Sequence, residues 1–261
     1  MHEQAARALG VRYHYHLIEV AGADREELRA LLDGVRRLGF AGVNVTFPYK
    51  EAVIDLLDEL SPGAAAIGAV NTVVVREDRL VGYNTDTTGF ARAVSHLVEG
   101  AGQAAVALIG AGGVGKAIAF ALTRLGVAEI RIFDADRNKA DQLAQALRPH
   151  GGAVVASDVE DAVRGVAGVV NATPVGMLPS RSTPVPDALL HDGLWVADAV
   201  YYPLLTPLLM AATAKGARIM TGRELAIYQA ADAFELFTGL SPSIIAMGNA
   251  FDGVIGKLHA T

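Results

Sequence analysis

Residues 104–134 read AAVALIGAGGVGKAIAFALTRLGVAEIRIFD, and this stretch decides the fold. Two short apolar runs flank a glycine-rich turn and a longer apolar segment with helical spacing. This order of strand, turn, helix and strand is the βαβ unit from which parallel sheets are built. Further apolar runs at residues 154–156, 168–171 and 195–199 suit the same sheet. The sequence therefore predicts an α/β protein with a doubly wound parallel sheet.

The glycine-rich turn of this unit matches the G-x-G-x-x-G pattern, directly after a strand and at the start of a helix. Glycines there allow a tight turn and let backbone N–H groups approach a pyrophosphate at the positive end of the helix. The alternative is a turn needed only for packing the helix on the sheet. We expect a Rossmann-type dinucleotide site whose candidate residues are Gly110, Ala111, Gly112, Gly113, Val114 and Gly115.

Acidic residues follow the glycine turn at about the 20-residue spacing expected for a ribose ligand. Asp134 ends the second apolar run, and Asp136 lies two positions further on. A carboxylate accepts hydrogen bonds from ribose hydroxyls and repels a 2′-phosphate, whereas NADP sites place an arginine nearby. The sequence thus favours NAD, although Arg137 can reach a phosphate if the loop curls back. Asp136 has a second interpretation as a solvated turn residue.

The residues before this unit indicate a second α/β segment. Alternating side chains predict a strand over residues 13–20, and Asp24 with Glu27 forms a capping box at the start of an amphipathic helix that ends at Gly39. Residues 40–46 predict a strand, residues 53–60 an amphipathic helix, and residues 69–75 and 80–83 two more strands. Near the other end of the chain, residues 222–238 have helical spacing.

Composition excludes several classes of protein. The chain of 261 residues has a net charge of −6 with scattered lysines and arginines, so it has no footprint for nucleic acid. It has no cysteine, which excludes disulfides, thiolate catalysis and cysteine-ligated zinc. His14 and His16 are better explained as a strand face than as metal ligands. We find no signal peptide and no membrane-spanning run, and expect a cytoplasmic protein.

Oxidation of an alcohol by hydride transfer also needs a group that takes the hydroxyl proton. Without cysteine or a well-placed histidine, lysine is the natural candidate. Lys50, followed along the chain by Asn71 and Asp86, supplies an amine, an amide and a carboxylate near strand or loop ends. A lysine at a helix start is also commonly a solvated surface residue. From these residues alone the cluster remains a hypothesis.

The chain resembles shikimate dehydrogenases along essentially its whole length. The motifs that carry the resemblance occur in the expected order: NVTFPYK (44–50), GAVNTV (68–73), YNTDTTGF (83–90), GAGGVGKA (110–117), NATPVGM (171–177), DAVYYPLLTPLL (198–209) and GRELAIYQAADAF (222–234). The resemblance implies hydride transfer between a nicotinamide cofactor and a small-molecule substrate, shikimate or quinate. It also implies two domains with a cleft between them: residues 1–87 with 222–261 for the substrate, and residues 88–221 for the dinucleotide.

The same resemblance implies roles for individual residues. Lys50 and Asp86 would form the catalytic pair, with the lysine exchanging the proton of the reacting hydroxyl. The matching substrate-binding positions are Thr46, Asn71, Tyr201 and Gln229, of which the last two can instead be core residues. The matching positions beside the nicotinamide are Asn171, Thr173, Pro174, Met177, Val200 and Gly222. No position matches a metal ligand.

Two departures from the family pattern matter. NADP-using members have Asn-Arg-Thr where this chain has Asp134-Ala135-Asp136, which makes it similar to the NAD-dependent quinate/shikimate dehydrogenases. Members also carry a strand and a Ser-x-Ser or Ser-x-Thr pair, which holds the substrate carboxylate, ahead of a Met-His helix that here begins at residue 1. We expect a missing upstream segment rather than a redesigned site. The alternative function is a catalytically impaired NAD-binding relative, and the protein is expected to be a monomer or a homodimer.

Overall fold

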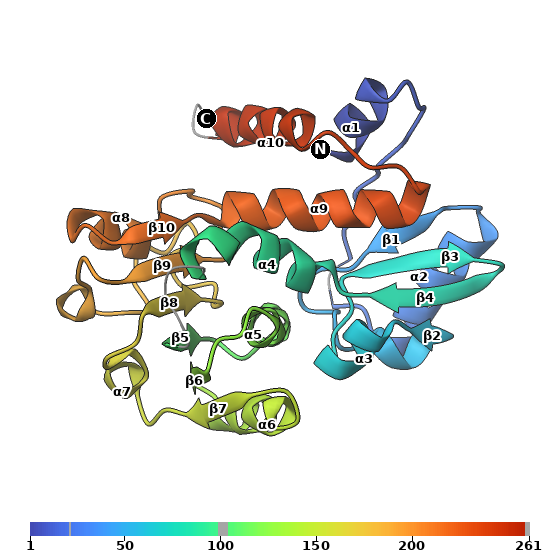
Figure 1. Ribbon diagram of the computed structural model, residues 1–261. Coiled ribbons are helices and arrows are strands. Elements are labelled where there is room, and N and C mark those ends of the chain that lie inside the picture. Colours follow the sequence, from blue (N-terminus) through green and yellow to red (C-terminus); the bar gives the residue numbers. More distant parts are fainter. Residues whose placement is uncertain (21, 99–103, 259–261) are drawn as a thin grey trace. The chain divides into compact units, whose positions relative to one another are not determined.

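The computed structural model describes residues 1–20, 22–98 and 104–258, and the chain divides into two units (Figure 1). One unit comprises Met1–Thr85 with Ile227–Thr261, and the other comprises Asp86–Ala226. The first unit is therefore discontinuous in sequence. Each unit has its own sheet.

The unit of residues 86–226 is built on a parallel sheet with the strand order β10-β9-β8-β5-β6-β7. Its strands are β5 (Ala105–Ile109), β6 (Glu129–Phe133), β7 (Gly152–Val155), β8 (Gly168–Asn171), β9 (Trp195–Asp198) and β10 (Arg218–Met220). The chain runs from β5 outward to β7 and then returns to β8 on the other side of β5. This topological switch beside β5 is the feature of doubly wound sheets at which ligands bind, and it confirms the predicted fold class.

Helices cover both faces of this sheet, because strands buried on both sides need apolar cover (Figure 1). On one face lie α5 (Gly113–Arg124) and α6 (Arg137–Leu147); on the other lie α7 (Val159–Val163) and α8 (Pro207–Ala214). A short 3-10 helix, η2 (Asp187–Leu189), precedes β9, and α4 (Thr85–Val98) leads into the unit. Gly168 allows the close packing of Trp195, since a Cβ at residue 168 would lie 2.0 Å from the indole Cε2.

The other unit contains a four-stranded sheet with the order β1-β3-β4-β2. Its strands are β1 (Gly42–Asn44), β2 (Glu59–Leu60), β3 (Thr72–Arg76) and β4 (Arg79–Tyr83). A two-residue turn joins β3 to β4, and its two residues, Glu77 and Asp78, both have positive φ, as the right-handed twist of a hairpin favours. The sheet is mixed, because β2 pairs parallel with β4 while the other pairs are antiparallel.

Helix α2 (Arg25–Arg37) and the short α3 (Pro62–Ile67) bury their apolar residues against this sheet. The predicted capping box is present, because Asp24 accepts the N–H of Glu27 at 2.9 Å and Glu27 accepts the N–H of Asp24 at 3.0 Å. Leu28, Leu32 and Val35 of α2 are buried, whereas Leu38, the C-cap residue, is 76% exposed. Helix α9 (Gly222–Thr238) has the bounds predicted for residues 222–238. Its Phe237 packs closely on β1, since a Cβ at Gly42 would lie 2.5 Å from the Phe237 ring.

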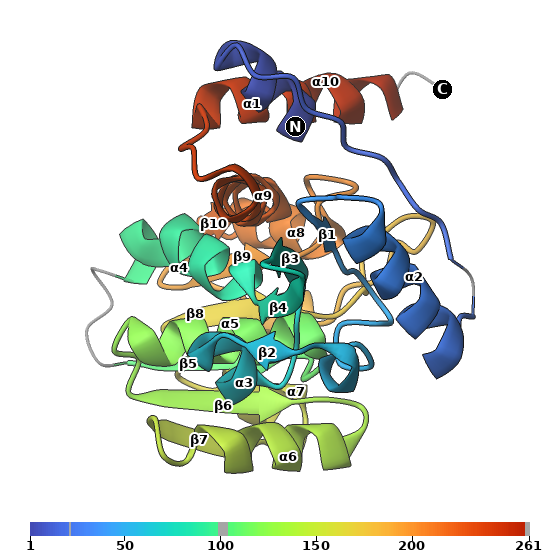
Figure 2. The ribbon, with the colours of Figure 1, turned by 90° about the vertical axis from the view of Figure 1, so that its right-hand side faces the viewer.

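The predicted strand over residues 13–20 is wrong. Residues 11–20 form no regular secondary structure, and Figure 2 shows this segment running from α1 (His2–Ala8) toward α2 outside the sheet. Side chains hold it instead: the N–H of Tyr15 donates to the Glu3 carboxylate at 3.2 Å, and its hydroxyl donates to Asn44 Oδ1 at 2.8 Å. Alternation indicates an extended chain, but a strand also requires a neighbour for its backbone hydrogen bonds.

The predicted helix over residues 53–60 is also wrong. This stretch forms turns, the 3-10 helix η1 (Ile54–Leu56) and strand β2. Asp58 and Leu80 exchange hydrogen bonds, with the Asp58 N–H donating to the Leu80 carbonyl at 3.0 Å and the Leu80 N–H donating to the Asp58 carboxylate at 2.7 Å. Because these bonds pair the chain with β4 after one short helical turn, the helix predicted from the spacing of apolar residues does not form.

His2, the first residue of α1, lies in a cluster of aromatic rings with Tyr13, Tyr15, Phe234 and Phe237, and α1 packs on α10 (Ile244–Leu258). Its ring stacks on Tyr15 with 4.3 Å between centroids and at an interplanar angle of 7°. The side chain is buried, and its Nδ1 has no hydrogen-bond partner among the described residues. Burial lowers the pKa of His2 to about 4, because the charged ring loses its hydration.

We predict that His2 makes folding less favourable as the pH falls from about 6.5 toward 4. In that range the ring is neutral in the folded protein and charged in the unfolded chain, so the unfolded state binds more protons. The loss approaches about 3 kcal/mol at the acidic end. Urea unfolding of the wild type and of His2→Phe, which keeps a stacking ring, should give free energies that diverge as the pH drops. Parallel pH profiles for the two proteins would contradict this expectation.

Candidate functional site

The hydrogen-bond register brings the ends of four strands into one row. Phe133, Ile109, Asn171 and Asp198 lie side by side across β6, β5, β8 and β9. The residues that follow them therefore emerge at the carboxyl edge of the sheet, next to the topological switch. This edge carries the predicted dinucleotide residues of the unit.

The glycine turn after β5 brings backbone atoms closer together than side chains allow. Gly110 has φ of +104°, and a Cβ on it would lie 2.9 Å from the Ala172 carbonyl carbon. A Cβ on Gly115 would lie 2.1 Å from the Gly110 carbonyl oxygen. Helix α5 begins at Gly113 with Gly112 as its N-cap, and no side chain occupies that cap. The turn thus presents the N-terminus of a twelve-residue helix, a favourable place for phosphate oxygens.

Asp134 is tied to this turn rather than held only by solvent. Its Oδ2 accepts the N–H of Ala111 at 2.7 Å, and its Oδ1 accepts the N–H of Asp136 at 2.8 Å. The carboxylate therefore links the glycine turn to the loop after β6. Each of its oxygens retains a second lone pair, so this arrangement is compatible with a ribose ligand.

Asp136 and Arg137 begin the next helix. Asp136 is the N-cap of α6 and accepts the N–H of Asn138 at 3.1 Å. The Arg137 guanidinium lies 3.7 Å from the Asp141 carboxylate, one helical turn further on, and is well exposed. A negative carboxylate thus caps the N-terminus of α6, where the helix dipole favours it.

The loop after β8 is organised by Asn171, which is fully buried. Its Oδ1 accepts the N–H and the hydroxyl of Thr173 at 3.0 and 2.7 Å. Its Nδ2 donates to the Val175 carbonyl at 3.1 Å and to Asp198 Oδ1 at 2.9 Å. Pro174 and Met177 of the same loop are exposed. The predicted cofactor residue Asn171 therefore shapes its loop through its own amide.

Asp198 is a buried carboxylate that sequence reasoning missed. It accepts hydrogen bonds from Asn171, from the Thr206 hydroxyl at 2.7 Å and from the Val200 N–H at 2.9 Å. Burial raises its pKa to about 6, and the hydrogen bonds from Thr206, Val200 and Asn171 oppose that rise. An acidic residue at the end of a strand buried on both faces was the sequence signal available for it.

The loop after β9 lies against the start of α9. A Cβ on Gly222 would lie 2.4 Å from the Val200 carbonyl oxygen, so only glycine fits there without movement. Val200 is buried, whereas Tyr201 is 53% exposed and is not a core residue. Gln229, one of the predicted substrate contacts, is half-buried on α9.

The unit that contains Lys50 has a polar network centred on Asn71. The Asn71 amide accepts the N–H of Thr85 at 2.8 Å and donates to the Thr85 hydroxyl at 2.9 Å. Thr72 donates to Asn71 Oδ1 at 3.0 Å and accepts Asn44 Nδ2 at 2.9 Å. Tyr15, through its hydroxyl bond to Asn44, extends the network. Sequence reasoning predicted Asn71 but missed the side chains that hold it.

Two backbone connections relate this network to Lys50 and to the start of α4. The N–H of Val70, next to Asn71, donates to the Lys50 carbonyl at 2.8 Å. Thr85, held by Asn71, is the first residue of α4 and precedes Asp86, which is buried. Lys50 itself is half-buried in a turn. Asn71 therefore fixes the first residue of the helix that carries Asp86, whereas the backbone of its neighbour Val70 holds the turn that carries Lys50.

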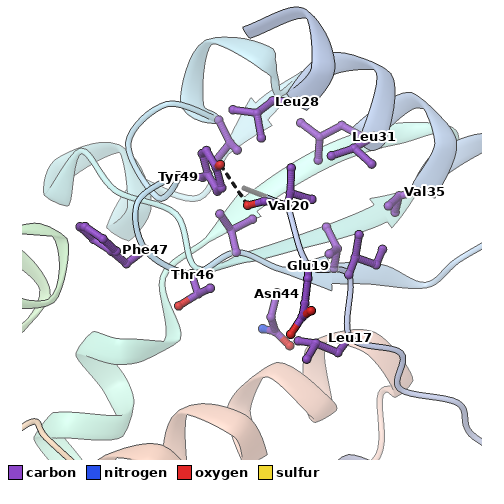
Figure 3. Close-up of a pocket in the computed structure, with 15 residues that line it drawn as sticks. Leu17, Glu19, Val20, Leu28, Leu31, Val35, Asn44, Thr46, Phe47 and Tyr49 are labelled. Carbon is purple, nitrogen blue, oxygen red and sulfur yellow. Dashed lines mark hydrogen bonds between the residues drawn. The ribbon is translucent and has the colours of Figure 1, made fainter. Parts of the chain in front are cut away.

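An apolar groove of about 550 Å³ lies between α2, β1 and residues 17–20 (Figure 3). Tyr49 lies at one end of the groove, where its hydroxyl donates to the Val20 carbonyl at 3.2 Å and accepts the N–H of Ala23 at 2.9 Å. Thr46 lines the groove, whereas Lys50 and Asn71 are not among its lining residues. Its walls are largely aliphatic, and Glu19 and Tyr49 are the residues with ionisable side chains among those that line it.

The described residues contain neither a cluster suited to a metal ion nor a helix suited to a membrane span. Within residues 1–20, 22–98 and 104–258, no three histidine, aspartate or glutamate side chains are grouped so that they could hold a metal ion. No helix in the same ranges has the length and hydropathy of a membrane span.

Two family profiles match the chain. The profile for the shikimate dehydrogenase substrate binding domain covers residues 1–73, and that for NADP oxidoreductase, coenzyme F420-dependent, covers residues 105–196. The quinate/shikimate dehydrogenase (NAD(+)) of Corynebacterium efficiens is 44% identical over 262 residues, covering 96% of this chain and 91% of the relative. The shikimate dehydrogenase (NADP(+)) of Streptomyces avermitilis is also 44% identical, over 95% of this chain and 87% of its own.

Solved structures agree with these relatives. The quinate dehydrogenase of Corynebacterium glutamicum in complex with NAD is 40% identical with a TM-score of 0.85, covering 97% of this chain and 92% of that one. The shikimate 5-dehydrogenase of Thermus thermophilus, in complex with NADP(H) and shikimate, is 38% identical with a TM-score of 0.85 and the same coverage.

We predict that Gly115→Ala destabilises the protein more than Gly112→Ala does. The new methyl group of Gly115→Ala meets a carbonyl oxygen at 2.1 Å, and relieving this overpacking should cost about 1–3 kcal/mol. A Cβ on Gly112 meets nothing within 4 Å, and this residue has negative φ. Denaturant unfolding of the two variants beside the wild type measures the difference. Equal stability losses would show that the close approach is not the constraint.

Proposed function

Because the chain belongs to the shikimate dehydrogenase family, we propose that it interconverts shikimate or quinate and the corresponding 3-dehydro acid by nicotinamide-dependent hydride transfer. The observation that carries the proposal is the glycine turn at the topological switch, where Gly110 and Gly115 meet at backbone distance and α5 begins. A pyrophosphate fits such a turn because the nearest groups are backbone N–H donors rather than side chains.

We assign the proton transfer of this reaction to Lys50. When bound, an oxidised nicotinamide cofactor would supply the acceptor for the hydride that leaves the carbon bearing the hydroxyl. The neutral amine of Lys50 takes the hydroxyl proton as the C=O bond forms, and its ammonium form returns that proton in the reverse direction. Asp86 is assigned to orient the amine and the substrate. The adjacent residues Val70 and Asn71 support this assignment, because Val70 holds the turn of Lys50 through its backbone N–H and Asn71 holds the residue that precedes Asp86.

Substrate hydroxyls are assigned to Thr46, Asn71, Tyr201 and Gln229. Asn71 has the best structural support, because its amide is already oriented by bonds with Thr72 and Thr85. An amide nitrogen carries two N–H donors, and Thr85 accepts one of them. We assign the second to a ring hydroxyl of the substrate. Such prior orientation lowers the cost of binding because little rotational freedom is lost.

We further propose that NAD is preferred over NADP. The carboxylates of Asp134 and Asp136 lie at the end of β6 and the start of α6, where they repel a 2′-phosphate. The partner of Arg137 supports the same preference, since its guanidinium is directed toward Asp141 in its own helix. The Corynebacterium efficiens relative and the Corynebacterium glutamicum structure both carry NAD in their names.

Lys50→Ala should lower kcat for shikimate and quinate oxidation by about 10²–10⁴-fold, the usual contribution of a general base. Lys215→Ala, at the exposed C-cap of α8, is the matched control and should keep full activity. Steady-state rates with each substrate and each cofactor, together with NADH binding by calorimetry, measure both effects. Full activity in Lys50→Ala would reject its role. A wild type that binds NADH but turns over neither substrate would instead identify a catalytically impaired relative.

Asp136→Asn should lower the NAD-over-NADP ratio of kcat/KM by about tenfold, because it removes a charge that repels the 2′-phosphate. Asparagine is as good an N-cap as aspartate, so α6 should stay intact. The control is Asp158→Asn, which makes the same change at the N-cap of α7. Kinetics with both cofactors provide the ratio. A wild type that already prefers NADP would contradict our interpretation of this loop.

A further inference from the structure

Asp198 has no part in the reaction described above, yet it is the most completely enclosed carboxylate at the carboxyl edge of the sheet. It is 0% exposed and lies directly across from Asn171 in the register of β8 and β9. Burying a carboxylate is costly, and apolar residues of similar size commonly give equal or greater stability. Stability alone therefore gives a weak reason for an acid at this position.

Among the described residues, three groups from three different segments donate hydrogen bonds to this carboxylate. Asn171 Nδ2 belongs to the end of β8, the Val200 N–H to the loop after β9, and the Thr206 hydroxyl to the N-cap of α8. Thr206 at the same time accepts the N–H of Leu209 at 3.3 Å, so its hydroxyl proton is committed to Asp198. Only a group that accepts on both oxygens satisfies all three donors.

The two loops joined in this way also touch the glycines of the predicted cofactor site. The methyl group of Thr173 would lie 2.8 Å from a Cβ on Gly110, and the Val200 carbonyl oxygen would lie 2.4 Å from a Cβ on Gly222. Thr173 is oriented by Asn171, and Val200 by Asp198. A change at Asp198 is therefore transmitted to both loops over one or two hydrogen bonds.

We propose that Asp198 is a positioning residue for hydride transfer, which holds the loops of Thr173 and Val200 at the spacing that orients the nicotinamide ring. This inference rests on the proposed function, which assigns the nicotinamide end of the cofactor to those loops. Asp198 acts through Asn171 and the Val200 N–H and does not contact the ring. The adenosine end belongs to the glycine turn and Asp134, so it should be insensitive to this carboxylate.

The test compares NADH with ADP-ribose, which has the same adenosine and pyrophosphate but lacks the nicotinamide. Asp198→Asn replaces one acceptor oxygen by a donor facing Thr206, and Thr206→Val removes the hydroxyl. In both variants the Kd for NADH from calorimetry should rise about tenfold, the effect of one lost charge-assisted hydrogen bond, while the Kd for ADP-ribose stays within about twofold. The kcat at saturating cofactor should fall in both variants. Thr206→Ser, which keeps the hydroxyl, should have the kcat of the wild type.

Leu147→Ala is the control for loss of stability, because Leu147 is fully buried on α6 and lies outside the two loops. Its ratio of the two Kd values should equal that of the wild type. The inference is overturned if both Asp198→Asn and Thr206→Val bind NADH as the wild type does, or if they weaken NADH and ADP-ribose equally. A wild type that binds neither ligand overturns the proposed function itself and the inference with it. If Asp198→Asn does not fold, Thr206→Val decides alone.

Discussion

The parallel pairing of β8 with β5 on one side and β9 on the other is the constraint on which the rest of the site depends. It aligns Ile109, Asn171 and Asp198 in a single row, so that three loops leave the sheet at the same edge. Loops that emerge together must satisfy their polar groups against one another, because the strands beneath them are buried on both faces. The glycine turn and the amide–carboxylate pair are two solutions to that one problem.

At the glycine positions, the absence of a side chain lets these loops approach one another closely. Gly110, Gly115 and Gly222 each stand where a Cβ would meet a backbone atom at less than 3 Å, so the backbone itself forms the surface of the turn. Such a surface offers N–H groups to a phosphate without the entropy cost of ordering long side chains. Asp134 then fixes the turn from β6 by accepting the Ala111 N–H.

The unit of residues 1–85 and 227–261 uses an amide in the same organising role. Asn71 directly precedes β3 and Asn171 is the last residue of β8, and both accept a hydrogen bond from a nearby threonine through Oδ1. In each case an asparagine that the sequence predicts as a binding residue also holds the conformation of its own loop. A substitution of either asparagine therefore changes ligand contacts and local geometry together, and conservative variants are needed to separate the two effects.

Local patterns in the sequence predicted some parts of this protein well. The βαβ unit, the strand at residues 168–171, the capping box of Asp24 and the helix at residues 222–238 depend on neighbours close in the chain, and all were predicted. Residues 13–20 and 53–60 were predicted wrongly because their conformation depends on distant partners, Glu3 and Asn44 in one case and Leu80 in the other.

The amino-acid sequence by itself determined the fold class, the glycine turn and the family motifs, because spacing along the chain encodes all three. Only the tertiary structure decided how the candidate residues are held. Three hydrogen bonds that hold them cannot be predicted from periodicity in the sequence: Asp134 with Ala111, Asn71 with Thr85, and Asp198 with Thr206. They arise from strand register and loop packing, which bring together groups separated by up to 23 residues in these pairs.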